Sequence, residues 1–539
     1  MPTIRNPILP GFNPDPSIVR VGEDYYIATS TFEWYPGVQI HHSRDLANWE
    51  LVTRPLSRAS QLDMRGNPDS CGIWAPCLSY ADGLFWLVYT DVKRKDGSFK
   101  DAHNYLVTAP AIEGPWSDPV YMNSSGFDPS LFHDDDGRKW LVNMLWDHRS
   151  RPLLFAGIAL QEYDHGQKKL VGPIKNIYQG TELKLVEGPH LYKRRGHDGR
   201  PWYYLLTAEG GTGYEHACTL ARARSIAGPY ETHPQKHILT AKDAPLNPVQ
   251  RAGHGDIVDT PDGRTYLVHL MGRPTTQKRR CVLGRETGIQ QAEWRDDDWL
   301  WVKDGPVPAL EVDVPGARDD TRYWAERRYR FDGPLHEDFQ WLRTPATERI
   351  FRLEGGALRL VGRESPGSWF EQALVARRVT HFSFDAETIV EFSPADERQF
   401  AGLTHYYGRY NFHYLAVTAH SDGRRELLLM SSPGSFPDGK LVYPGAPIPL
   451  PQQGPVRLKM EVRGPALQFF YALGDGDWQP AGPVLDASLI SDECGGHAEH
   501  GSFTGGFVGM ACSDLDGTAR QAAFAQFVYR PVRHQTDRY

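Results

Sequence analysis

One phrase recurs along this chain, and it constrains the possible folds more than any other feature. Residues 13–30 read NPDPSIVRVGEDYYIATS, and residues 126–145 read GFDPSLFHDDDGRKWLVNML. Each copy has a polar or aromatic residue near small residues or proline, then a short apolar run, a turn and a second apolar run. The five copies begin at Asp15, Trp74, Asp128, Glu187 and His254, separated by 59, 54, 59 and 67 residues. Such a period predicts a repeat architecture.

The turn inside each copy indicates a β-hairpin. The turn aspartates are Asp24, Asp82, Asp136, Asp198 and Asp262, and four of the five precede glycine. Asp-Gly between two apolar runs is a strong hairpin signal. Units of about 60 residues that hold several short strands are typical of propeller blades. We therefore predict an all-β fold that begins with a five-bladed β-propeller. A β-helix would need shorter repeats, and a TIM barrel would need helices between its strands.

The repeat also predicts a site. The innermost strand of each blade lines the central axis of a propeller, so the first residues of the five copies should meet at one end of it. They comprise three carboxylates, one tryptophan and one histidine. Neighbouring carboxylates force their pKa values apart, and a neutral acid beside an ionised base is what glycoside hydrolysis requires. Taken singly, each residue also fits a structural role, such as an Asp-Pro turn or a buried histidine.

Other features of the chain bear on cofactors, partners and location. The chemistry requires no cofactor, although His254 beside carboxylates is also a candidate Ca²⁺ site. Six cysteines without CxxC spacing give no support for a zinc site or a disulfide framework. A net charge of -8 without a basic stripe argues against nucleic acid as a partner. The start, MPTIRNPILPGF, lacks an apolar signal segment, and no run approaches the roughly 18 apolar residues of a membrane helix. We therefore expect a cytoplasmic protein without a membrane partner.

A second domain is predicted after the repeats, which end at WRDDDWLWVKDG, residues 294–305. Runs such as ETIVEFS, RELLLMS and LQFFYAL alternate and are separated by Gly and Pro turns, which is typical of an antiparallel β-sandwich. The 15 Trp, 25 Tyr and 23 Phe suit strands, and flat rings also suit sugar binding. We predict a catalytic propeller at residues 1–310, a linker at 311–325 and a β-sandwich at 326–539.

Several motifs resemble a known family. The phrases NPDPSI, GIWAP, GFDPS and EGPH resemble glycoside hydrolase family 43. The phrases ATSTFEWYPGVQIHHSRDL, GRETGIQ and FTGGFVGM are similar to those of its two-domain β-xylosidases. The resemblance runs from about residue 5 to the C-terminus. It implies a five-bladed propeller that hydrolyses by inversion, with exo action that releases xylose from the non-reducing ends of xylo-oligosaccharides.

The resemblance also implies roles that the residues alone leave open. Asp15 would be the general base, Glu187 the general acid, and Asp128 would orient Glu187 and keep its pKa raised. The implied sugar-binding residues are Arg285 near the carboxylates, His254 at the pocket floor, Phe32, Trp74 and Thr207 around the first sugar, and Phe127 and Trp146 at the leaving sugar. A loop of the second domain, HGSFTGGF, would close the pocket with Phe503. Phe507 is the alternative, but it begins a strand and is expected in the core.

Several functional alternatives stay open at this stage. An α-L-arabinofuranosidase or a bifunctional enzyme would keep the chemistry and change the sugar. A non-catalytic sugar-binding propeller would use the same ring of residues, but it has no need for carboxylates with separated pKa values. A fructosidase on a five-bladed propeller would carry other motifs than NPDPS and EGPH. The resemblance further implies a homo-oligomer, either a tetramer or a dimer.

Overall fold

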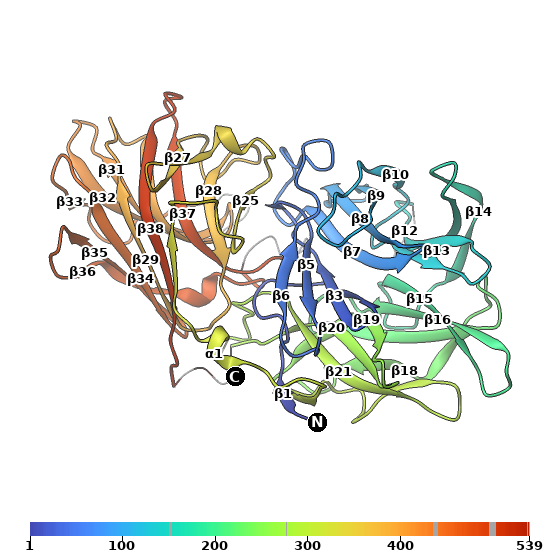
Figure 1. Ribbon diagram of the computed structural model, residues 1–539. Coiled ribbons are helices and arrows are strands. Elements are labelled where there is room, and N and C mark those ends of the chain that lie inside the picture. Colours follow the sequence, from blue (N-terminus) through green and yellow to red (C-terminus); the bar gives the residue numbers. More distant parts are fainter. Residues whose placement is uncertain (150–153, 276–277, 435–439, 495–502, 536, 538–539) are drawn as a thin grey trace.

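The predicted all-β architecture, a five-bladed propeller followed by a β-sandwich, is confirmed (Figure 1). The computed structural model describes residues 1–149, 154–275, 278–434, 440–494, 503–535 and 537. Within these ranges the helical elements are α1 (Asp320–Tyr323) and the 3₁₀ turns η1 (Thr347–Arg349) and η2 (Ala487–Leu489). None of the helices in the described part is long and apolar enough to span a membrane.

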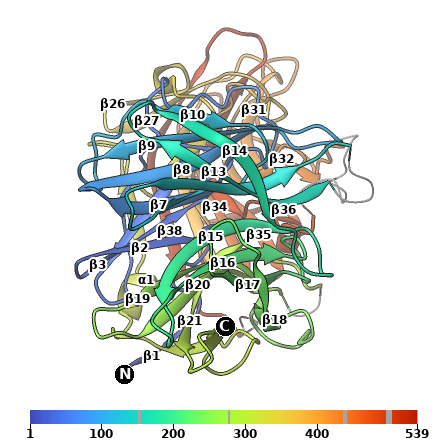
Figure 2. The ribbon, with the colours of Figure 1, turned by 90° about the vertical axis from the view of Figure 1, so that its right-hand side faces the viewer.

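Each propeller blade is a four-stranded antiparallel sheet. The blades surround a common axis in Figure 1, and Figure 2 shows the propeller from its side, in front of the sandwich. The first two blades consist of β2 (Ser17–Val21), β3 (Asp24–Thr29), β5 (Gln39–Ser43) and β6 (Glu50–Thr53), and of β7 (Gly72–Ala81), β8 (Leu84–Arg94), β9 (Asp101–Ala109) and β10 (Val120–Asn123). The third consists of β11 (Ser130–His133), β12 (Lys139–Trp146), β13 (Phe155–Asp164) and β14 (Lys169–Tyr178). The last two consist of β15 (Glu187–Arg195), β16 (Pro201–Glu209), β17 (Ala217–Ala223) and β18 (Glu231–Thr240), and of β19 (Gln250–Asp259), β20 (Thr265–Gly272), β21 (Glu286–Trp294) and β22 (Leu300–Val302).

The propeller closes through its innermost strands. These strands, β2, β7, β11, β15 and β19, each contact the next, and β19 contacts β2. Apolar side chains fill the space between neighbouring blades; between the fifth and first blades they include Val268, Ile289, Ile18 and Ile27. Their burial supplies the main driving force for closing the ring. The repeated sequence unit is therefore one blade, whose first strand faces the axis.

Two eight-stranded sheets form the sandwich. One holds β26 (Phe351–Glu354), β27 (Ala357–Val361), β38 (Gln521–Pro531), β29 (Phe384–Glu391), β34 (Val456–Arg463), β35 (Ala466–Leu473) and β36 (Gln479–Asp486), with β24 (Arg327–Arg330) also paired to β38. The other holds β33 (Ile448–Pro449), β32 (Arg425–Pro433), β31 (Asn411–Ala419), β30 (Gln399–Gly408), β37 (Phe507–Asp514), β28 (Ala373–Arg378), β25 (Phe339–Leu342) and β4 (Trp34–Tyr35).

The two halves of the molecule share structure. Strand β4 lies within the first propeller repeat, yet it pairs with β25 of the sandwich. Its Trp34 stacks on Phe507 with ring centroids 3.6 Å apart and an interplanar angle of 11°. Phe507 is fully buried, so its expected place in the core is confirmed. This shared strand and its apolar packing fix the sandwich beside the propeller.

The segment predicted as a linker, residues 311–325, has structure of its own. It contains β23 (Glu311–Asp313), which pairs with β1 (Thr3–Arg5) at the chain start, and helix α1. Asp319 caps α1 by accepting a hydrogen bond from the backbone N–H of Thr321. The connection thus runs along the propeller before the sandwich begins.

Candidate active site

A cavity of about 690 Å³ opens at one end of the propeller axis. The predicted residues that line it are Asp15, Phe32, Trp74, Phe127, Asp128, Trp146, Glu187, His254, Arg285 and Phe503. Sequence reasoning missed the other lining residues, which are Lys95, Gly97, Lys100, Leu154, Phe155, Leu185, Gly211, Thr212 and His216. The five residues that begin the sequence repeats therefore meet in one place, as their spacing predicts.

Thr207 is the predicted sugar-binding residue that the structure places outside the cavity lining. It lies in β16, paired with Thr219 of β17, and its side chain is fully buried. Its hydroxyl lies 3.4 Å from the carbonyl oxygen of Thr219, which it faces as a donor. The threonine in the cavity wall is instead Thr212, in the loop after β16.

The backbone bends in the same way where each blade reaches the axis. The residues at this bend have left-handed φ angles: Asp15 (54°), Ala75 (28°), Asp128 (55°), Gly188 (55°) and His254 (45°). For residues other than glycine this conformation is strained, and such strain often occurs at functional sites. In two blades the residue at the bend is not the first residue of the sequence repeat but the next one, because Trp74 and Glu187 come immediately before it. All five side chains nevertheless line the cavity.

Asp15 lies in surroundings that favour its charged form. Burial alone would raise its pKa, but the charges of Arg285 and His254 and a hydrogen bond from Ser30 lower the pKa below its usual 3.8. Ser30 Oγ donates to Asp15 Oδ2 at 2.6 Å, and a guanidinium nitrogen of Arg285 donates to Oδ1 at 3.2 Å. Asp15 is thus held as a carboxylate with both oxygens oriented.

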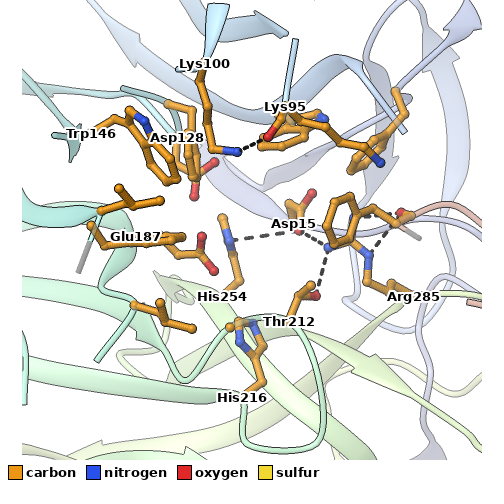
Figure 3. Close-up of a pocket in the computed structure, with 18 of the residues that line it drawn as sticks. Asp15, Lys95, Lys100, Asp128, Trp146, Glu187, Thr212, His216, His254 and Arg285 are labelled. Atoms are coloured by element: carbon orange, nitrogen blue, oxygen red, sulfur yellow. Dashed lines mark hydrogen bonds and ion pairs between the residues drawn. The ribbon is translucent and has the colours of Figure 1, made fainter. Parts of the chain in front are cut away.

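Glu187 and Asp128 show the opposite behaviour. Enclosure by the protein, then the negative charges of Asp128 and Asp15, raise the pKa of Glu187 well above 4.5. Burial and the charge of Asp15 raise the pKa of Asp128 to about 8. The backbone N–H of Gly188 donates to Asp128 Oδ2 at 3.0 Å, which ties Asp128 to the residue after Glu187. In Figure 3, Asp15 and Glu187 lie on opposite sides of His254.

A buried polar layer supports these residues from below. It consists of the side chains two positions after each bend, Ser17, Cys77, Ser130, His190 and Asp256. Ser17 Oγ donates to Asp256 Oδ2 at 2.9 Å, and His190 Nδ1 lies 3.7 Å from the same oxygen. Burial would lower the pKa of His190, but Asp256 and Cys77 raise it to about 9. Polar contacts thus extend around the axis beneath the carboxylates.

The described side chains around His254 do not form a metal-binding cluster for the calcium ion considered from the sequence. Among the described residues, no group of three or more His, Cys, Asp or Glu side chains is arranged to hold a metal ion. His254 Nδ1 lies 4.0 Å from Asp15 Oδ1, and the guanidinium of Arg285 binds that same oxygen. Calcium takes six to eight oxygen ligands, and the side chains here supply few of them. Burial lowers the pKa of His254 to about 4, so the ring is neutral near pH 7.

Aromatic rings form one wall of the cavity. The Trp74 ring meets the rings of Phe32, Phe127 and Phe503 at centroid distances of 5.9, 5.2 and 5.8 Å. Phe503 comes from the sandwich, and its carbonyl oxygen accepts a hydrogen bond of 2.7 Å from Arg285. The structure therefore places Phe503 at the propeller cavity. Rings of this kind suit the apolar faces of a sugar.

Two lysines that line the cavity carried no sequence signal, because KRKDGSFK (residues 93–100) reads as a solvated loop. Lys100 Nζ lies 4.4 Å from the centroid of the Trp146 ring and donates to the carbonyl oxygen of Lys95 at 2.5 Å. Burial lowers the pKa of Lys100 to about 8. Lys95 Nζ lies 5.1 Å from the centroid of the Phe503 ring. The rim thus combines cations with aromatic rings.

Taken together, the cavity holds an ionised carboxylate opposite a protonated one, with aromatic rings beside them. That combination is what glycoside hydrolysis requires. Residues 4–300 match the model of glycosyl hydrolases family 43, and residues 328–530 match the beta xylosidase C-terminal concanavalin A-like domain. The chain belongs to glycosyl hydrolases family 43.

Individual relatives agree along the whole chain. A protein named xylosidase/arabinosidase 43B from Humicola insolens is 74% identical, with 100% of each chain covered. A beta-xylosidase from Bacillus subtilis is 49% identical over 98% of this chain and 99% of its own. The solved xylan beta-1,4-xylosidase from Bacillus halodurans C-125 superposes with a TM-score of 0.92 at 52% identity, covering 98% of this chain and 100% of the other.

The bend after Glu187 gives a test of the local geometry. A Cβ atom at Gly188 would lie 2.9 Å from His254 Cε1, in addition to the left-handed φ. Gly199, in the hairpin turn of the same blade, also has a left-handed φ but nothing within 4 Å of its Cβ position. We expect Gly188→Ala to lower the free energy of unfolding by about 1–3 kcal/mol more than Gly199→Ala, as overpacking does. Urea unfolding measures both, and equal losses would contradict the close packing.

Proposed function

We propose that this family 43 enzyme is an exo-acting, inverting β-D-xylosidase that releases xylose from the non-reducing ends of xylo-oligosaccharides. The observation that carries the proposal is the opposite pKa shift of Asp15 and Glu187 in one cavity. The names of the relatives, which are xylosidases, support the choice of sugar. Family 43 membership supports inversion.

The roles of the carboxylates follow from their protonation. Glu187 donates its proton to the glycosidic oxygen as the bond to the sugar C1 breaks. Ionised Asp15 takes a proton from the water whose oxygen forms the new bond to C1 on the opposite face. Asp128 keeps the pKa of Glu187 raised through its charge, and Arg285 holds Asp15 in place. Net protons balance, because Asp15 gains one and Glu187 loses one.

The shape of the cavity supports action at chain ends. Trp74, Phe32 and Phe503 close one side of it, and Trp146 and Lys100 stand on the rim away from Asp15 (Figure 3). A terminal sugar against these rings would leave the rim for the sugar that departs. Aromatic faces and a few oriented polar groups suit such a small, hydroxyl-rich ligand.

A second activity has a specific observation in its favour. The relative from Humicola insolens, 74% identical, carries both xylosidase and arabinosidase in its name. We therefore propose α-L-arabinofuranosidase activity as a side reaction of the same three carboxylates. The ratio of the two activities is obtained by measuring the rates of aryl arabinofuranoside and aryl xyloside hydrolysis with one enzyme preparation.

Replacing the carboxyl group of Glu187 by an amide tests its role as the general acid. Glu187→Gln should lower turnover of xylobiose by about 10²–10⁴-fold, because no proton reaches the leaving oxygen. An aryl xyloside with a good leaving group should lose much less, since its departure needs little protonation. Initial rates with both substrates make the comparison, and Glu182→Gln, on an exposed glutamate five residues upstream, should leave both unchanged. A loss below tenfold with xylobiose removes Glu187 from this role.

The negative charge of Asp128 should affect the pH dependence of kcat/KM. Activity falls as pH rises through the pKa of Glu187, because the acid must be protonated. Removing the negative charge lowers that pKa, so Asp128→Asn should move the alkaline limb of kcat/KM to lower pH by about one unit. The acid limb of the same profile, which Asp15 sets below pH 3.8, should keep its position. Asp136→Asn, in the exposed turn of the same blade, is the matched control; an unmoved alkaline limb in Asp128→Asn would contradict the coupling.

A further inference from the structure

The segment that carries Phe503 is held at successive backbone groups. The N–H of Phe503 donates to Ser70 Oγ at 3.2 Å, and its carbonyl oxygen accepts from Arg285 at 2.7 Å. The next residue, Thr504, donates its N–H to the hydroxyl oxygen of Tyr407 at 3.0 Å. Tyr407 lies on β30 of the sandwich and does not line the cavity. The position of the Phe503 ring thus depends on a tyrosine outside the sugar pocket.

The Tyr407 hydroxyl is in turn fixed by a buried ion pair between the two domains. It donates to Asp492 Oδ1 at 2.6 Å, and Arg251 of the fifth blade donates to Asp492 Oδ2 at 2.7 Å. Arg251 also donates to Glu493 Oε1 at 2.8 Å, while the other oxygen of Glu493 accepts from the N–H of Cys281 at 2.8 Å. The sequence places Arg251 three residues before His254, so the chain of contacts starts beside the active site.

The residues that form this chain of contacts are buried, which is why the contacts matter. Arg251, Asp492 and Tyr407 are at most 8% exposed, and buried charges require partners. The single proton of the Tyr407 hydroxyl goes to Asp492, so its oxygen is free to accept from Thr504. Losing the hydroxyl would therefore leave both the Thr504 N–H and an oxygen of Asp492 without this partner.

We propose that Tyr407, Asp492 and Arg251 are positioning residues for sugar binding, which act through Phe503. They fix the aromatic ring that the sandwich adds to the propeller pocket. The affinity of the inner sugar site then depends on an ion pair that spans the domain boundary. The inference rests on the proposed function for the identity of the substrate, whereas the contacts do not depend on that function.

The neighbouring tyrosine provides a matched control. Tyr406 and Tyr407 are 3% and 2% exposed on the same strand, and the Tyr406 hydroxyl has no hydrogen-bond partner among the described residues. With 4-nitrophenyl β-xyloside, Tyr407→Phe should raise KM and the inhibition constant of xylose about tenfold, with kcat within about threefold. Phe503 contacts bound sugar but moves no proton, so binding should suffer more than turnover. Tyr406→Phe should change neither.

A double-mutant cycle separates positioning from a general structural effect. In a Phe503→Ala background, Tyr407→Phe should leave KM unchanged within about twofold, because the ring it positions is gone. An equal rise of KM in both backgrounds overturns the proposal, as does a lowered melting temperature with unchanged KM. If Tyr407→Phe does not fold, Asp492→Asn replaces it in the same cycle, with a smaller rise of KM expected.

Failure of the proposed function would be recognised separately. Wild-type protein that fails to cleave the β-xyloside contradicts the proposed function and leaves the contacts to be tested with another sugar. The same cycle is then run with 4-nitrophenyl α-L-arabinofuranoside, for which the same loss of coupling is expected. Additive effects on that substrate overturn the positioning role.

Discussion

Three carboxyl groups enclosed at one end of the propeller axis are the constraint on which the site depends. Like charges this close cannot all be ionised, so the surroundings decide which groups keep a proton. Arg285, His254 and Ser30 favour the ionised form of Asp15, whereas Glu187 and Asp128 have raised pKa values. An acid and a base for one reaction thus arise from side chains of nearly the same chemistry.

The fold supplies this arrangement through radial repetition and then adds to it from outside. Five bends direct Asp15, Trp74, Asp128, Glu187 and His254 into one cavity, and a buried polar layer supports them. The sandwich adds one more aromatic ring, that of Phe503, to the wall that Phe32 and Trp74 form. Because β4 pairs with the sandwich and Arg251 binds Asp492, the two domains hold this ring in a fixed place.

The repeats allowed the propeller, and the convergence of five residues, to be predicted from sequence. Periodicity does not resolve a shift of one residue, so the left-handed bend at Ala75 and Gly188 was not anticipated. It also carries no information on loops, which is why Lys95, Lys100, Thr212 and His216 were missed. Thr207, which was assigned from the family resemblance, lies outside the cavity lining and is buried in β16 beside Thr219. Pairing of β4 with the sandwich is non-local and had no sequence signal.

The stereochemistry of the first product tests the central claim most directly. Proton NMR of the anomeric signals during the earliest seconds of xylobiose hydrolysis distinguishes the two xylose anomers before they equilibrate. If Asp15 activates water opposite Glu187, the xylose released from the non-reducing end appears first as the α anomer. Appearance of the β anomer first would require a covalent intermediate and would contradict the role of Asp15 as a base.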